Sequence, residues 1–149
     1  MLSINYLNNW NQLQDETKPE LLTDFLSDNL DQFGDSKTAI RKAIDYAMSE
    51  ESGKGGFVIT AKEDKELVGV LVMNKTGMSE YIPENLLVYI AVKKDQRGKG
   101  IGAEIIKAAM QKTGSPIALH VEYDNPAKKL YERLGFSTKY AEMRFNPQG

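Results

Sequence analysis

The sequence predicts a mixed α/β fold of the α+β type, in which helices cover a mixed and mostly antiparallel sheet. Two amphipathic helical segments lie early in the chain, and two β-prone runs separated by a polar turn follow. A strand, a glycine-rich turn and a helix then come in direct succession. The length of 149 residues, of which 41% are apolar and 27% charged, predicts one domain over residues 1–149 with a hydrophobic core.

The N-terminal third predicts a strand and two helices. Residues 2–7 alternate apolar and polar side chains, which is the period of a half-buried strand. Apolar side chains recur at helical spacing over residues 22–33, after a capping box that begins at Thr17. A second helical stripe covers residues 40–48, and Asp or Ser at 35–36 is expected to cap it. Such stripes indicate core-facing helices.

The middle of the chain predicts a hairpin and a central strand. Residues 57–61 and 67–73 are β-prone, and the charged residues between them indicate a solvent-exposed turn. Residues 74–85 lack periodicity and form a loop, either a substrate rim or a plain connector. Residues 86–92 are apolar without polar alternation, as expected of a strand covered on both faces.

A glycine-rich turn leads from this strand into a helix. Gly98, Gly100 and Gly102 stand at alternate positions, with Arg97 and Lys99 among them. Glycine lets the main chain approach a ligand without Cβ atoms in the way, and the first N–H groups of a helix are free at the positive end of its dipole. The turn therefore predicts a phosphate or pyrophosphate site.

Several motifs could account for this turn. A Walker A loop requires Gly-Lys-Ser/Thr at its end, and the chain has no such string. A dinucleotide fingerprint is formally present at Gly98, Gly100 and Ala103, with a strand over 117–121 and Glu122 after it. However, a polar connector separates the strand from the glycines, and too little chain follows Glu122 for a second mononucleotide-binding half. A tight turn that serves packing alone stays open.

Composition narrows the function classes. A net charge of −2 without a long basic run argues against nucleic acid as the main partner. No apolar run reaches the ~18 residues of a membrane span and the N-terminus lacks signal-peptide features, so a cytoplasmic protein without membrane attachment is expected. The absence of cysteine excludes disulfides and thiol nucleophiles, and with the single His120 it leaves no expected metal site.

The C-terminal part predicts a strand, a helix and a final strand. Residues 117–121 are β-prone, and Asp124, Asn125 and Pro126 are typical of a helix start. An apolar stripe follows up to a glycine stop, and residues 136–145 are extended.

Two blocks of the sequence together resemble the GNAT N-acetyltransferase superfamily. The first is Val92 followed by Arg97-x-x-Gly100-x-Gly102, and the second is Ala127-x-x-Leu130-Tyr131-x-x-x-Gly135-Phe136 with Asn125 before it. The resemblance implies the GNAT fold, with a sheet of six to seven strands, four helices, and central strands that splay apart at the cofactor site.

The resemblance also implies a co-substrate, acetyl-CoA, and no metal. Pantetheine would lie between the splayed strands and pair with main chain of the central one. The spacing of the family's asparagine falls on Asp124, whereas Asn125 stands one position nearer the alanine, so either could meet pantetheine and we favour Asn125. The implied cofactor-binding residues are Ile90, Ala91, Val92, Arg97, Gly98, Lys99, Gly100, Ile101, Gly102, Asn125 and Tyr131.

The resemblance implies that Tyr131 is the general acid for the leaving thiolate, although its place in an apolar stripe is also typical of a core tyrosine. No carboxylate lies on the central strand, where branches of the family keep their base. Glu84, Glu122, Tyr89 and His120 are therefore candidates for the base, as is a water relay.

The function expected from this resemblance is direct transfer of an acetyl group to a primary amine in a ternary complex. The acceptor is a small-molecule amine or a protein amino group, and a homodimer stays open. The alternative is a module that binds acyl-CoA as a sensor, without turnover.

Overall fold

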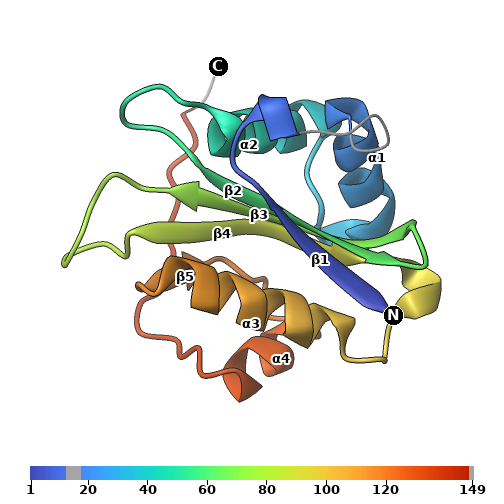
Figure 1. Cartoon of the computed structure of the whole chain (residues 1–149). Helices are drawn as coiled ribbons and strands as arrows, with labels where there is room; N and C mark the ends of the chain where they lie inside the picture. Colours follow the sequence, from blue (N-terminus) through green and yellow to red (C-terminus); the bar gives the residue numbers. More distant parts are fainter. Residues whose placement is uncertain (13–17, 148–149) are drawn as a thin grey trace. The chain divides into compact units, whose positions relative to one another are not determined.

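The computed structural model describes residues 1–12 and 18–147 (Figure 1). The chain groups into two compact units, Met1–Leu119 and His120–Gly149. The predicted fold class is confirmed, because the first unit combines helices with a mixed, mostly antiparallel sheet.

The first unit contains a five-stranded sheet in the order β1-β2-β3-β4-β5. The first four strands are antiparallel neighbours, and β5 pairs in parallel with β4. Their bounds are β1 Leu2–Leu7, β2 Gly56–Glu63, β3 Glu66–Lys75, β4 Asn85–Val92 and β5 Ile117–Leu119.

Helices cover both faces of this sheet (Figure 1). α1 (Pro19–Asn29) and α2 (Lys37–Met48) contact one face, and α3 (Ile101–Thr113) contacts the other. The buried residues of α2 are those of its predicted apolar stripe, and α1 buries Leu22 and Leu26 of its stripe together with Thr23. The Ser36 hydroxyl accepts the N–H of Ala39 at 3.2 Å, which confirms a cap at 35–36. Thr17, the predicted cap of α1, lies outside the described residues.

A β-bulge in β4 changes the direction of its side chains. Tyr89 lies opposite Val72 and Leu87 lies opposite Met73, so Val88 is an extra residue in the ladder. Residues directly opposite each other share a face of the sheet. Tyr89 therefore joins Val72 in the core under α1 and α2, whereas Leu87 shares the opposite face with Met73.

The second unit contains one helix, α4 (Ala127–Arg133), and residues 136–147 follow without regular secondary structure. The predicted strand over 136–145 is therefore wrong, and the described sheet has five strands rather than six to seven. A strand needs a neighbouring edge for its N–H and C=O groups, and no ladder among the described residues includes this segment. Its side chains at Tyr140, Met143 and Phe145 are 77%, 90% and 88% exposed.

None of the helices within residues 1–12 and 18–147 combines the length and apolar character of a membrane span.

Candidate functional site

The second half of β4 has a free edge. Pairing with β5 ends at Leu87. On the opposite edge the N–H of Lys93 donates to the carbonyl of Val68 at 2.8 Å, so by alternation the N–H groups of Ile90 and Val92 point away from β3. No strand ladder in the described part of the chain pairs with these two groups. An extended ligand with amide groups can pair with such an edge as an added strand.

The strand residues predicted to bind the cofactor, Ile90, Ala91 and Val92, differ in whether their main-chain groups are free to bind a ligand. By the same alternation, Ala91 directs its main-chain groups to β3, and its side chain is buried in the core. The carbonyl of Val92 accepts a hydrogen bond from Arg97 Nε at 3.2 Å. Ile90 is thus the residue whose N–H and C=O both remain open at this edge.

The glycine-rich turn follows β4 and a 3₁₀ turn, η4 (Lys94–Gln96). Gly98 and Gly100 have φ of +81° and +82°, a left-handed conformation that favours glycine. A Cβ added to either glycine would meet no atom within 4 Å, so the space beside the turn is open. The N–H groups of residues 98–103 find no acceptor among the described residues, since the first bond across the start of α3 is from Glu104 to the Gly100 carbonyl. This row of N–H groups fits a phosphate or pyrophosphate.

Arg97 connects the turn to the end of α1. Its Nη1 donates to Asp31 Oδ2 at 2.9 Å and its Nη2 to the carbonyl of Asn29 at 2.6 Å. Asp31 has φ of +55° and also lies 3.4 Å from Lys94 Nζ. The hydrogen bond from Arg97 is the main cause that lowers the pKa of Asp31. The charge of Arg97 is therefore paired, and its contacts indicate that it fixes the shape of the turn.

The ammonium group of Lys99, unlike the guanidinium of Arg97, is not paired with a carboxylate among the described residues. Its Nζ donates to the Gln96 side chain at 3.1 Å, and no carboxylate among the described residues pairs with it. Of the two predicted cations in the turn, Lys99 is the one available to a phosphate.

Tyr131 is the buried residue of α4. It is 8% exposed, and its ring lies edge to face with Phe136 at 6.0 Å. Burial raises the pKa of the hydroxyl to about 12, so it is protonated at neutral pH. The hydroxyl has no hydrogen-bond partner in the described part of the chain. The Tyr131 hydroxyl is therefore protonated and free to donate a hydrogen bond to a ligand.

Asn125 lies just before α4. Its Oδ1 accepts the N–H of Ala127 at 2.9 Å, and its Nδ2 has no acceptor within residues 1–12 and 18–147. Asn125 is half-buried, whereas Asp124 is exposed. The side chain of Asn125 thus accepts the N–H of the first helical residue through Oδ1 and keeps an amide donor at Nδ2.

The candidate bases occupy different environments. Glu84 is half-buried directly before β4. The Tyr89 hydroxyl donates to Asp35 at 2.5 Å, and burial together with this bond raises its pKa, so Tyr89 keeps its proton and is unsuited to be a base at neutral pH. His120 and Glu122 are exposed in the second unit.

Among the described residues, no group of three or more histidine, aspartate or glutamate side chains could hold a metal ion.

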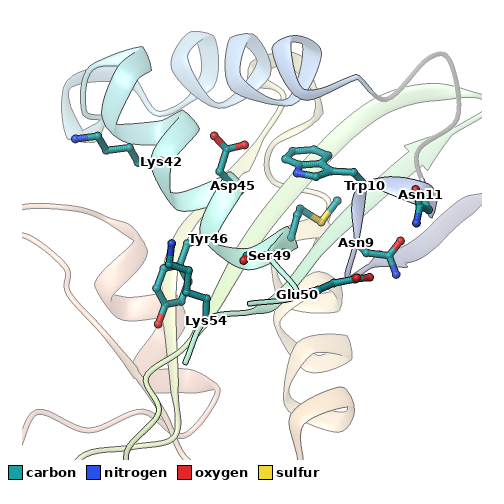
Figure 2. Close-up of a pocket in the computed structure, with 10 residues that line it drawn as sticks. Asn9, Trp10, Asn11, Lys42, Asp45, Tyr46, Ser49, Glu50 and Lys54 are labelled. Carbon is teal, nitrogen blue, oxygen red and sulfur yellow. The ribbon is translucent and has the colours of Figure 1, made fainter. Parts of the chain in front are cut away.

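A cavity lies away from these residues. It has a volume of about 690 Å³ and is lined by residues before α1, by α2 and by the loop after α2, including Trp10, Asp45 and Glu50 (Figure 2). A second cavity of about 420 Å³ includes Glu84. Neither is lined by β4 beyond Asn85 or by the glycine-rich turn. We place the site at the free N–H groups, because a ligand that pairs with a strand edge and a helix start needs no enclosed cavity.

Comparison with known proteins identifies relatives. Residues 54–138 match the family model of the acetyltransferase (GNAT) domain. Mycothiol acetyltransferase of Corynebacterium aurimucosum is 43% identical over 53 residues, which cover 32% of this chain and 17% of that protein. The match therefore spans less than a fifth of the length of that protein.

Solved structures share the fold. A protein of Pyrococcus horikoshii has a TM-score of 0.71 at 23% identity, covering 96% of this chain and 93% of its own. Ribosomal-protein-alanine N-acetyltransferase of Brucella melitensis has a TM-score of 0.67 at 17% identity, covering 98% and 99%. An aminoglycoside acetyltransferase from an uncultured soil metagenomic sample, in complex with sisomicin, has a TM-score of 0.63 at 17% identity, covering 99% and 95%.

Proposed function

Because this chain belongs to the GNAT acetyltransferase family, we propose that it is an N-acetyltransferase that transfers the acetyl group of acetyl-CoA to a primary amine. The observation that carries the proposal is the row of unpaired N–H groups at residues 98–103, which follows the free edge of β4 in the chain. We take residues 1–149 as one catalytic domain. With no cysteine in the chain to carry a thioester, the transfer is direct.

The chain offers complementary groups for each part of acetyl-CoA. The N–H groups of residues 98–103 and the ammonium group of Lys99 suit the pyrophosphate. Ile90 offers an N–H and a C=O to the amides of pantetheine, and the free Nδ2 of Asn125 is a further donor. Arg97 acts indirectly, through its contacts with Asp31 and Asn29.

The reaction forms a C–N bond and breaks the C–S bond of the thioester. The neutral amine attacks the carbonyl carbon, and an N–H at the β4 edge, such as that of Ile90, stabilises the charge on the carbonyl oxygen. The hydroxyl of Tyr131 donates its proton toward the departing sulfur. Its raised pKa of about 12 makes Tyr131 a weaker acid than an exposed tyrosine, so much of its effect is a hydrogen bond to the developing thiolate.

The amine loses its proton to water or to a carboxylate. Glu84 precedes Ile90 by six positions, which corresponds to roughly 20 Å along an extended strand. Direct transfer from an amine that attacks a carbonyl beside Ile90 is therefore out of its reach. We propose a water relay, with Glu84 as a base only for a carbonyl nearer the start of β4.

Arg97 and Asp31 should act as one unit in cofactor binding. We expect Arg97→Met and Asp31→Asn each to weaken acetyl-CoA binding several-fold, and the double variant to be no weaker than the worse single variant, because the pair fixes one loop conformation. Calorimetric titration of the four proteins measures this coupling. Additive losses would instead mean that Arg97 contacts the phosphates independently of Asp31.

Turnover separates an enzyme from a sensor. We expect release of CoA from acetyl-CoA to depend on an added amine, in a panel that contains simple amines, sisomicin and a peptide with N-terminal alanine. The last two probes follow from the names of the structural relatives. Tight acetyl-CoA binding with no amine-dependent CoA release across the panel would favour the non-catalytic sensor, and a thermal shift with NADH but none with CoA would overturn both.

A further inference from the structure

Asp35 is a carboxylate beside the central strand that the proposed reaction does not use. It lies between η3 (Asp31–Phe33) and Ser36, which precedes α2. Its Oδ2 accepts the hydroxyl of Tyr89 at 2.5 Å, a contact between residues 54 positions apart. Tyr89 is buried in the core, so this hydrogen bond fixes where the carboxylate stands relative to β4.

Asp35 forms no ion pair with the residues that the structure describes. Asp35 is exposed, and no lysine, arginine or histidine among the described residues forms an ion pair with it. Neighbouring carboxylates differ, since Asp31 pairs with Arg97 and Asp24 pairs with Lys37. Asp35 does not cap α2 either, because the hydroxyl of Ser36 accepts the N–H of Ala39 at the start of that helix. Neither an ion pair nor a cap therefore explains this carboxylate.

The bulge in β4 determines which way Asp35 faces the proposed reaction. Tyr89 directly precedes Ile90, and it points from the sheet toward α1 and α2 because Val88 shifts the register. The free N–H of Ile90 instead lies in the plane of the sheet. The carboxylate of Asp35 therefore lies on the face of the sheet that α1 and α2 cover, at the end of the Tyr89 side chain. The thioester carbonyl that the N–H of Ile90 would bind lies instead at the edge of the sheet, one residue further along β4.

Resting on the proposed function, we propose that the acceptor carries a second positive charge and that Asp35 binds it. The amino group that attacks the thioester must be neutral, whereas a second ammonium group can remain charged and donate to the open Oδ1 of Asp35. The offset between the strand edge and Asp35 suits an acceptor with two amino groups joined by a short aliphatic chain. Asp35 is then a specificity-determining residue.

Putrescine and butylamine test this assignment, because they share a carbon chain and differ in the second amino group. We expect the wild-type protein to favour putrescine in kcat/KM. In Asp35→Asn this preference should fall about 10- to 100-fold, mainly through KM, the scale of one hydrogen bond to a charged group. Asparagine still accepts the Tyr89 hydroxyl, so the variant removes the charge while the contact with Tyr89 is retained.

Asp64→Asn is the matched control. Asp64 lies in the exposed turn between β2 and β3, has φ of +50°, which asparagine tolerates, and loses the same charge. This variant should keep the wild-type preference for putrescine. An unchanged preference in Asp35→Asn, or no preference in the wild type, would overturn the role of Asp35.

A binding measurement separates this proposal from the proposed function. Putrescine should bind the CoA-loaded wild-type protein and lose about 10- to 100-fold in affinity with Asp35→Asn, whether or not turnover occurs. If no amine is acetylated but this difference in binding is present, the acetyltransferase assignment fails and the Asp35 site stands. If amines are acetylated but putrescine binding is the same in both proteins, only the Asp35 site fails.

Discussion

Tyr131→Phe is expected to lower kcat by about 10²-fold or more, the usual scale for removal of one positioned proton donor. The ring and its contact with Phe136 remain, so acetyl-CoA affinity should hardly change. The melting temperature should also hardly change, because the hydroxyl has no hydrogen-bond partner among the described residues. The measurements are kcat with a working acceptor, acetyl-CoA affinity, and the melting temperature.

Tyr140→Phe is the matched control, since Tyr140 is 77% exposed in the same unit and loses the same atom. It should retain wild-type kcat. If Tyr131→Phe also retains wild-type kcat while its melting temperature falls, Tyr131 is a core residue and the acid of the reaction must be sought elsewhere.

The pH dependence of the donor has a definite sign. Burial disfavours the tyrosinate and raises the pKa of Tyr131 to about 12, so the hydroxyl is protonated below that pH. Its ionisation therefore removes the donor only as the pH approaches 12. Any loss of kcat at lower pH is expected from protonation of the amine, which must be neutral to attack.

Much of the fold was predictable because its signals are local. Alternation over residues 2–7 gives β1 with the same bounds. The helix predicted after the glycine-rich turn is α3, but it begins at Ile101, so Gly102 lies inside the helix rather than in the turn. The stripe of α2 and its cap at Ser36 are also encoded within a few positions. Period and capping depend on neighbouring residues only, so one sequence suffices to recognise them.

The site was less predictable because its contacts are long-range. Arg97 meets Asp31 across 66 positions, and no sequence pattern links a loop arginine to a residue after α1. Asp35 was recognised only as a helix cap, because its contact with Tyr89 depends on the fold. The bulge at Val88 could not be predicted either, because an apolar run without alternation does not show which side chains change face.

Gly100→Val is expected to lower acetyl-CoA affinity by about 10²-fold or more. Gly100 precedes α3 with φ of +82°, and the Cβ of valine would project into the open space beside the free N–H groups. A phosphate held there by several N–H groups would be displaced, and each hydrogen bond lost to a charged group costs about 1.5–3 kcal/mol. Isothermal titration with acetyl-CoA measures the effect.

Gly114→Val separates this effect from backbone strain. Gly114 ends the same helix with φ of +60°, and an added Cβ there also meets nothing within 4 Å. Each valine forces an L-residue into the left-handed region, at about 1–2 kcal/mol, so both variants should lose similar stability. Only Gly100→Val should lose acetyl-CoA binding, because the C-terminal end of α3 presents carbonyl groups, which repel a phosphate. Undiminished affinity in Gly100→Val, with the melting temperature lowered as in Gly114→Val, would show that the turn is a packing feature and not the phosphate site.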